Sequence, residues 1–302
     1  MTINAKIIAD SVNPDGVRIT TLQLKYPKFI NGEFNMHRTF SRNHSSSRAI
    51  PVERLIQEII DDPVIPAFWG ANQKGMSAVV ETDAPVTVDL KTWVLNPTSD
   101  DEGKKWNNHP FYNPRTFTRL EAWLEARDAA IETARGYAKA GYHKQIVNRL
   151  LEPWYHINTV VTSTEWENFF KLRCHPDAQP EMRALAEAMR DAIDTTIPIP
   201  LNWGWWHLPY ITPELSCVGD PNDIKSSVAR CARVSYLTHD QKQTTMEEDL
   251  KLFERLANFD PKHLSPTEHQ AQALQFQVEP MGKPASNFHP SWLQFRRIVE
   301  QQ

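Results

Sequence analysis

Residues 36–48 hold the densest group of side chains that could take part in chemistry. This stretch combines three arginines and two histidines with several hydroxyl side chains and an amide. A guanidinium fork suits a phosphate or the edge of a pyrimidine, and serine hydroxyls with free backbone N–H groups complete a cradle for an anion. Because Ser and Asn side chains compete with the backbone for hydrogen bonds, we expect a polar loop here. Composition alone is equally compatible with a solvated loop that has no function.

The elements around this loop are predicted from hydrophobic spacing and turn signals. Residues 6–9 and 17–24 are expected to form a β-hairpin, because Asn-Pro-Asp-Gly at 13–16 is a turn signal. A helix is expected with Pro51 as its first residue. Further along, the spacing predicts a helix over 118–140 that ends at Gly141 and a helix over 143–151 that stops before Pro153. A strand is predicted over 157–161, followed by a helix that a capping box at 162–165 opens. Two more helices are predicted, one over 178–193 and one that opens at 244–247. This mixture indicates an α/β (α+β) fold.

Residues 63–117 interrupt this pattern. Six prolines and an acidic run at 100–102 punctuate the region, and a loop of this length is commonly a lid or a binding loop. Its aromatic residues argue against full disorder, because disordered segments are poor in them. We therefore predict an ordered, irregular insertion with little regular structure.

The overall composition bounds the class of protein. The chain has 302 residues, of which 40% are hydrophobic and 23% charged, as is usual for a soluble globular protein. A formal net charge of −4 argues against long nucleic acid as a partner. The three cysteines, including Cys217, lack metal-ligand spacing, so they fit a reducing compartment and predict no metal site. With no membrane-spanning run and no signal-peptide pattern, we expect a cytoplasmic protein without membrane contact.

The spacing within residues 36–48 resembles RHRxxSxxxxSxR, a motif of the flavin-dependent thymidylate synthases. Five of its positions are matched, by His37, Arg38, Ser41, Ser46 and Arg48. Met36 replaces the first arginine of the motif. Residues 168–173, Asn-Phe-Phe-Lys-Leu-Arg, are similar to a second signature, N-F-x-x-L-R, and Arg149 falls where the family has a substrate-binding arginine.

Two further signatures stand in an unusual order. Residues 228–236 resemble the family's A-R-V-S-[YF] segment, and residues 263–269 resemble H-x-[ST]-P-x-E-H. In the family both precede the arginine-rich motif, whereas here both follow it. The chain is therefore similar to a circularly permuted member, with one catalytic domain over residues 1–302, an insertion at 63–117 and a permuted segment at 226–275. Permutation is tolerable when the original termini lie close together.

The resemblance implies an enzyme that uses reduced FAD to build a methyl group on C5 of dUMP. Methylenetetrahydrofolate would supply the carbon, and NADPH would reduce the flavin. A homotetramer with active sites between subunits is also implied. No GxGxxG segment follows a predicted strand, so the dinucleotide would be held without a Rossmann crevice.

The same resemblance implies roles for individual residues. Arg173 matches the catalytic arginine that stabilises charge as it develops on the pyrimidine ring. The residues expected to bind the nucleotide are Glu33, His44, Ser45, Ser46, Ser47, Arg48, Arg149 and Arg173. The residues expected to bind the flavin are Met36, His37, Arg38, His44, Asn168, His263 and Ser265. For His263, a purely structural role is an equal alternative.

Three departures from the family leave the substrate open. Met36 stands in place of an arginine, His44 in place of a glutamate and Glu33 in place of a glutamine. Met36 removes a donor for O4 of uracil, while the Glu33 carboxylate could accept from the amino group of cytosine. We expect methylation of dUMP, with 5-hydroxymethylation of dCMP or dUMP as the alternative. A second alternative, motivated by Met36, is a catalytically inactive protein that binds a nucleotide or RNA.

Overall fold

The computed structural model describes residues 2–93, 110–212, 218–235, 244–257, 260–275 and 286–300. The expectations for Cys217, for Tyr236 at the end of its signature and for residues 94–109 of the insertion lie outside the described residues. For residues 89–93 and 110–113 only the backbone is described.

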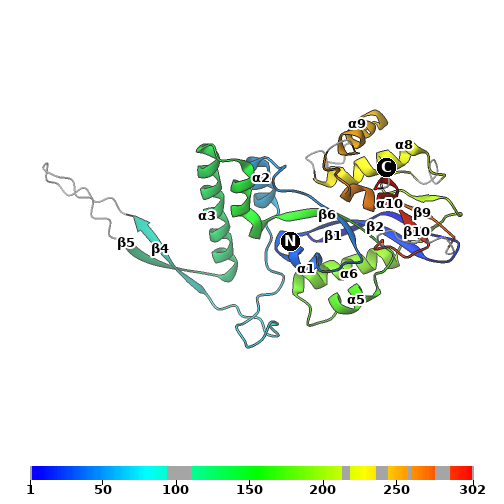
Figure 1. Ribbon diagram of the computed structural model, residues 1–302. Helices are drawn as coiled ribbons and strands as arrows, with labels where there is room; N and C mark the ends of the chain where they lie inside the picture. The colour runs from blue at the N-terminus through cyan, green and yellow to red at the C-terminus, as the bar shows by residue number, and fades with distance from the viewer. Residues whose placement is uncertain are drawn as a thin grey trace.

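A five-stranded sheet forms the centre of the fold (Figure 1). Its strands are β1 (Asn4–Val12), β2 (Arg18–Pro27), β3 (Ser41–His44), β6 (His156–Ser163) and β7 (Ile199–Pro200). They lie in the order β3-β6-β2-β1-β7, and all neighbours pair antiparallel except β1 and β7, which run parallel. The predicted hairpin near the start of the chain and the predicted strand over 157–161 are confirmed.

The turn between β1 and β2 forms where the sequence predicts it. The Gly16 N–H donates to the Asn13 carbonyl at 2.9 Å, and the Val17 N–H donates to Oδ1 of Asn13, also at 2.9 Å. Gly16 has a φ of 78°, a left-handed conformation that glycine adopts without the steric cost of a Cβ atom. The Asn and Gly of the signal therefore each have a specific structural role.

Residues 41–44 form strand β3, so the predicted polar loop is wrong for this part of the motif. The backbone of β3 pairs with β6, where His44 lies opposite Thr159. Alternate residues of the strand, Ser41 and Asn43, are buried. The backbone N–H and C=O groups of β3 form hydrogen bonds with β6, so they are not left to the Ser and Asn side chains that would favour a loop. The chain leaves the sheet only after His44.

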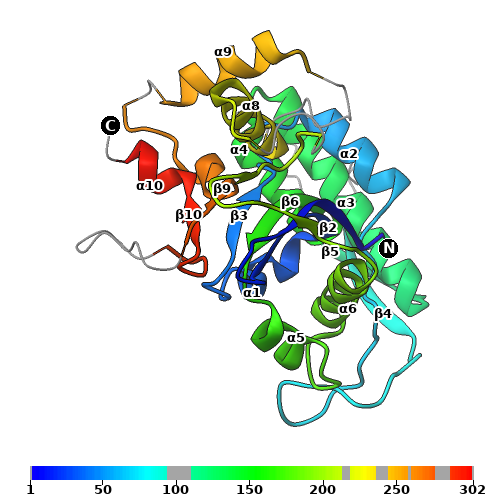
Figure 2. The ribbon, with the colours of Figure 1, turned by 90° about the vertical axis from the view of Figure 1, so that its right-hand side faces the viewer.

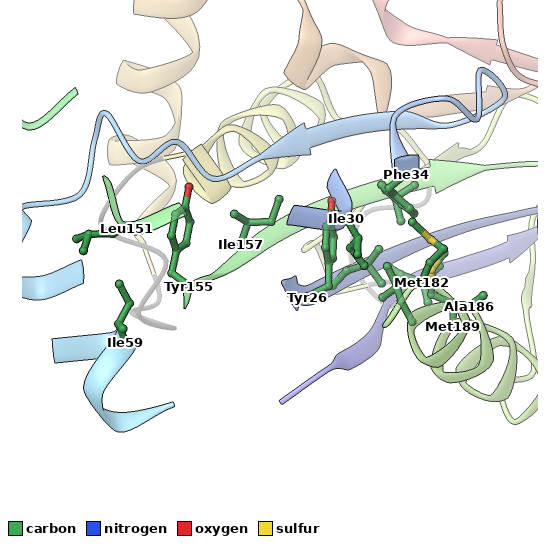
Figure 3. Close-up of a cluster of buried hydrophobic side chains, with 14 of the residues drawn as sticks. Tyr26, Ile30, Phe34, Ile59, Leu151, Tyr155, Ile157, Met182, Ala186 and Met189 are labelled. Carbon is green, nitrogen blue, oxygen red and sulfur yellow. The ribbon is translucent and has the colours of Figure 1, made fainter. Parts of the chain in front are cut away.

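One face of the sheet carries the main hydrophobic core (Figure 3). Alternate residues of β2 and β6 point to this side, namely Leu22, Leu24, Tyr26, Ile157 and Val161. The elements that contribute to this core include η1 (Lys28–Ile30), α1 (Asn31–Phe34), α2 (Val52–Asp61), α5 (Glu167–Arg173) and α6 (Pro180–Asp194). α2 begins one residue later than predicted, because Pro51 is its N-cap and not its first residue.

The opposite face of the sheet, the polar face, carries buried hydroxyl groups beside apolar residues such as Ile19 and Val160, and it is covered by the C-terminal part of the chain. Figures 1 and 2 show α8 (Pro221–Ala232) and α9 (Met246–Ala257) on the side opposite to α5 and α6. The hydroxyls of Thr21 and Thr162 lie 2.7 Å apart on this face. Each also contacts a buried histidine at 2.8 Å, His207 for Thr21 and His269 for Thr162.

Short elements complete the C-terminal part. They are η3 (Arg233–Ser235), η5 (Ser265–Glu268), α10 (Phe295–Val299) and an antiparallel sheet of β8 (Trp206–His207), β9 (Ala271–Ala273) and β10 (Trp292–Gln294). α9 opens where predicted, with the Glu248 N–H donating to Oγ1 of Thr245 at 3.3 Å and the Thr245 N–H donating to the Glu248 carboxylate at 3.0 Å. Within the described ranges, no helix has the length and apolarity that crossing a membrane requires.

Helix α3 (Arg119–Lys139) confirms the prediction for 118–140, since Thr118 and Glu121 form a capping box and Gly141 follows with a φ of 86°. The helix predicted over 143–151 is wrong in kind. This segment splits into α4 (Lys144–Val147) and the 3-10 helix η2 (Asn148–Trp154). Pro153, inside η2, cannot donate a helical hydrogen bond, and the chain tightens around it.

The capping box predicted at 162–165 does not form. Thr162 belongs to β6, and its hydroxyl is engaged on the polar face of the sheet. Oγ of Ser163 instead accepts from the Glu165 N–H at 3.0 Å in a local turn, and α5 begins only at Glu167. The helix predicted over 178–193 is confirmed as α6.

The predicted insertion is irregular in its first half and regular in its second. Residues 63–85 carry one isolated bridge, between Gly70 and Glu81. β4 (Val86–Trp93) then pairs antiparallel with β5 (Pro110–Phe117), and this hairpin extends away from the rest of the molecule (Figure 1). The expectation of little regular structure is thus wrong for the hairpin, because prolines are compatible with strands that have a free edge.

Replacing the core residue Phe34 tests this packing. Phe34 is fully buried at the end of α1, with its ring centroid 5.3 Å from Tyr26, 5.7 Å from Phe40 and 6.0 Å from Phe169. We expect Phe34→Ala to lower the free energy of unfolding by about 3–5 kcal/mol, measured by urea denaturation. Met76→Ala, at a fully exposed position, should change it by less than about 0.5 kcal/mol. Equal effects of the two variants would contradict the observed packing.

Candidate functional site

A cavity of about 520 Å³ brings the first signature and the last signature together. Its walls are formed by Asn43, His44, Ser46, Arg48, Ala49, Gln145, Ala232, Leu256, His263, Ser265 and Pro266. Five of these, His44, Ser46, Arg48, His263 and Ser265, are residues that the sequence analysis singled out. The C-terminal signature therefore lies beside the arginine-rich motif in space, although it follows that motif at a long distance along the chain.

The turn after β3 is fixed by backbone and side-chain hydrogen bonds. The Ser45 N–H donates to the Asn158 carbonyl at 2.7 Å, and the Asn158 N–H donates to Oγ of Ser45 at 3.0 Å. Nδ2 of Asn148 donates to the Ser47 carbonyl at 2.7 Å. Ser45 and Ser47 thus hold the turn, whereas Ser46 and Arg48 line the cavity.

His44 is held on two sides at the edge of this cavity. Its Nδ1 lies 2.8 Å from Oγ1 of Thr159, and its Nε2 lies 2.9 Å from Oδ1 of Asn35. Burial, followed by the positive charges of Arg42 and Lys28, lowers the pKa of His44 to about 4. The ring is therefore neutral near pH 7 and adds no positive charge to the cavity.

A second cluster lies between α1 and α5 and contains the proposed catalytic arginine. Nε of Arg173 donates to Nε2 of His37 at 3.1 Å, and Nη1 of Arg173 forms an ion pair with Glu33. The imidazole of His37 stands edge-on to the ring of Phe169, with centroids 4.8 Å apart. Burial, followed by the charges of Arg173 and Arg42, lowers the pKa of His37 to about 4, so this imidazole accepts from Arg173 as a neutral ring.

The short helix α1 connects the cavity and the second cluster. Glu33, within α1, faces Arg173, while Asn35, immediately after α1, contacts His44. The side chain of Asn31, at the start of α1, accepts a hydrogen bond of 2.9 Å from the Tyr26 hydroxyl. α1 is therefore anchored at both ends.

Four residues with proposed roles lie outside both groups. Met36 is 72% exposed, and Arg38 and Asn168 are also exposed. Arg149 is exposed on η2, where its Nε donates to the Gln145 carbonyl at 3.2 Å. None of the four is among the residues that line the cavity. The residues proposed to bind the nucleotide and the flavin therefore lie on several different surfaces of one chain.

The sequence analysis did not single out two polar residues of the motif segment, Asn43 in the cavity wall and Arg42 beside it. Asn43 lines the cavity, is 5% exposed, and its buried Nδ2 has no hydrogen-bond partner in the described part of the chain. Arg42 lies half-buried beneath the motif, and its Nη1 donates to the Phe34 carbonyl at 2.9 Å. Both occupy positions that the motif leaves unspecified, and only the pairing of β3 with β6 assigns them an orientation.

The neutral His44 predicts a pH dependence of stability. An exposed histidine has a pKa of about 6.5, so between this value and the lower pKa of folded His44 the unfolded chain binds more protons than the native one. The free energy of unfolding is therefore expected to fall as pH is lowered through this interval. We expect His44→Gln, measured by urea denaturation from pH 7 to pH 4, to lose part of this dependence. An unchanged dependence would contradict a neutral His44.

Comparisons with solved structures include the following two distant likenesses. A flavin-dependent thymidylate synthase ThyX from Helicobacter pylori, complexed with FAD and dUMP, is 17% identical over 58% of this chain and 67% of that chain, with a TM-score of 0.34. A UMP/dUMP methylase PolB from Streptomyces cacaoi, bound with 5-Br dUMP, is 13% identical over 63% of this chain and 89% of that chain, with a TM-score of 0.41. No curated protein matches the sequence.

The assignment to a family rests on a sequence match. The model of the family described as thymidylate synthase complementing protein matches residues 19–199. This range is more than half of the chain and includes the arginine-rich motif, Arg149 and Arg173. The chain therefore belongs to the thymidylate synthase complementing proteins, the family of the flavin-dependent thymidylate synthases.

Proposed function

We propose that this protein transfers a one-carbon unit from methylenetetrahydrofolate to C5 of a deoxypyrimidine monophosphate, with FAD as cofactor and NADPH as the reductant of FAD. Membership of the family supports this class of reaction. The observation that carries the proposal is the cavity in which Ser46 and Arg48 of one signature meet His263 and Ser265 of another. FAD and dUMP are the ligands of the Helicobacter pylori structure, and the ligands proposed here are FAD and a deoxypyrimidine monophosphate.

Circular permutation is part of this proposal. The matched range ends at residue 199, so the segment that carries His263 and Ser265 lies beyond it. Its place in the cavity wall supports the view that this segment belongs to the same catalytic domain. A chain whose original termini were joined and whose new termini opened elsewhere would keep such contacts, although the order of its signatures would change.

The residues around the cavity fit a flavin nucleotide. Arg48 supplies a cationic fork and Ser46 a hydroxyl, and the buried amide of Asn43 has a nitrogen without a partner in the described ranges. We propose that His44, His263 and Ser265 hold part of the flavin, and that Ser46 and Arg48, with Arg149, hold the phosphate of the substrate. FAD, when bound and reduced by NADPH, would supply the two electrons that a methyl product requires.

Arg173 is proposed to activate the pyrimidine. C5 of the ring is a poor nucleophile until negative charge can spread over the ring, and a fixed guanidinium stabilises that charge as it forms. His37 and Glu33 hold the guanidinium of Arg173 in place. The His37 imidazole, as a neutral acceptor, orients Arg173 without competing with it for negative charge.

We further propose a homotetramer with active sites between subunits. On one chain, the cavity and the Arg173 cluster are separate groups of residues joined through α1. Met36, Arg38 and Asn168 are exposed, where a second subunit could bring its own cavity against them. Light scattering on the flavin-loaded protein tests this arrangement, which an active monomer would contradict.

The first test of the function measures flavin binding and product. Purified protein is loaded with FAD and supplied with NADPH and methylenetetrahydrofolate, with dUMP and dCMP in separate reactions, and the nucleotide product is weighed by mass spectrometry. A methyl gain on dUMP identifies a thymidylate synthase activity. A hydroxymethyl gain on dCMP or dUMP, in which water and not a hydride completes the transferred methylene, identifies the alternative enzyme. A protein that takes up no FAD and converts neither nucleotide would favour the catalytically inactive binding protein.

Replacing Arg173 tests its catalytic role. We expect Arg173→Ala to lower kcat at least about a hundredfold while FAD stays bound, because the guanidinium acts mainly on charge in the transition state. Turnover and flavin absorbance are measured on the same preparation. Arg190→Ala removes a guanidinium that is 42% exposed on α6 and serves as the matched control. Near-normal turnover of R173A would refute the assignment.

A further inference from the structure

The ion pair between Glu33 and Arg173 places an acceptor directly beside donors. Oε1 of Glu33 pairs with Nη1 of Arg173, while Nε of Arg173 is engaged with His37. Oε2 of Glu33 and Nη2 of Arg173 make no hydrogen bond within the described ranges of the chain. The two side chains are 29% and 19% exposed, so a ligand can reach them while most solvent is excluded.

We infer that this pair reads the pyrimidine as cytosine, so that the preferred substrate is dCMP. This inference rests on the proposed function and narrows its substrate. Cytosine presents the N4 amino group as a donor, followed by N3 and O2 as acceptors. The Glu33 carboxylate can accept from N4, while free N–H groups of Arg173 donate to N3 and O2. All three positions of the cytosine edge then meet a partner of the opposite kind.

Uracil offers the reverse pattern at two of these positions. Its O4 would face the Glu33 carboxylate, and its N3–H would face N–H groups of Arg173, which pairs acceptor with acceptor and donor with donor. Uracil therefore matches the pair less well than neutral cytosine does.

A structural role alone does not account for the ion pair. The contact between α1 and α5 is already made by buried aromatic rings, because Phe34 packs against Phe169 with centroids 6.0 Å apart. A partly exposed ion pair adds little to such a contact.

The test is a binding measurement that does not depend on turnover. Isothermal titration calorimetry of the FAD-loaded protein compares dCMP with dUMP in the absence of folate and NADPH. We expect dCMP to bind roughly ten- to a hundredfold more tightly, the discrimination typical of one well-matched base edge. Glu33→Gln should lower this ratio at least about tenfold, because the amide NH₂ can donate to O4. Glu187→Gln, which alters an exposed glutamate paired with Arg183, is the matched control and should leave the ratio unchanged.

Each outcome of this experiment decides the inference. Equal binding, or tighter binding of dUMP by the wild-type protein, would overturn it, whereas conversion of dUMP to product would leave the proposed function standing. If Glu33→Gln weakens the binding of dCMP and dUMP equally, Glu33 has a structural role, and this result would also overturn the inference. Absence of binding for both nucleotides, together with no FAD uptake, would refute the proposed function and the inference together. If the variant fails to fold, the wild-type ratio alone still decides.

Discussion

The pairing of strand β6 along both of its edges is the constraint on which the rest of the structure depends. β6 pairs with β2 over its full length and with β3 along part of it. Both faces of β6 are buried, since Val161 enters the main core and Val160 packs against Cys231 and Val234. The backbone N–H and C=O groups of a strand that is buried on both faces can form hydrogen bonds only with the neighbouring strands, so the register of the strand is fixed. A shift of one residue would exchange its two faces and remove Thr159 from His44.

The polar face of the sheet fixes the C-terminal signature in place. Thr162 connects β6 to His269, and Gln294 connects β3 to η5 by donating to Oγ of Ser41 at 3.0 Å and to the Glu268 carbonyl at 2.9 Å. Burial lowers the pKa of His269 to about 3, so it contributes as a neutral ring. Because an unpaired buried polar group is costly, such contacts specify one arrangement of the covering segment. This arrangement places His263 and Ser265 in the cavity wall.

Local signals predict local structure well in this chain, and distant pairing accounts for the errors. The turn at 13–16 and the capping box of α3 depend on residues a few positions apart, and both form as expected. β3 was predicted as a loop because its residue types favour turns, and only its pairing with β6 overrides that preference. Thr162 has the sequence of a helix cap, yet β6 recruits it into the sheet. The signatures identified five of the eleven residues of the cavity wall, but the contact between Glu33 and Arg173 needs the packing of α1 on α5 and has no local signature.

Arg48 and His44 contribute differently to the cavity wall, one with a guanidinium and the other with an uncharged ring. His44 is neutral near pH 7 because it is buried beside Arg42, and the same holds for His37 beside Arg173. Arg48, by contrast, brings a guanidinium to the cavity wall. In the proposed role of this cavity, a bound phosphate gains its second negative charge near pH 6. A more highly charged phosphate binds a guanidinium more strongly, and the neutral ring of His44 stabilises the fold over the same pH interval. The site thus uses the neutral rings of His37 and His44 for orientation and guanidinium groups for charge.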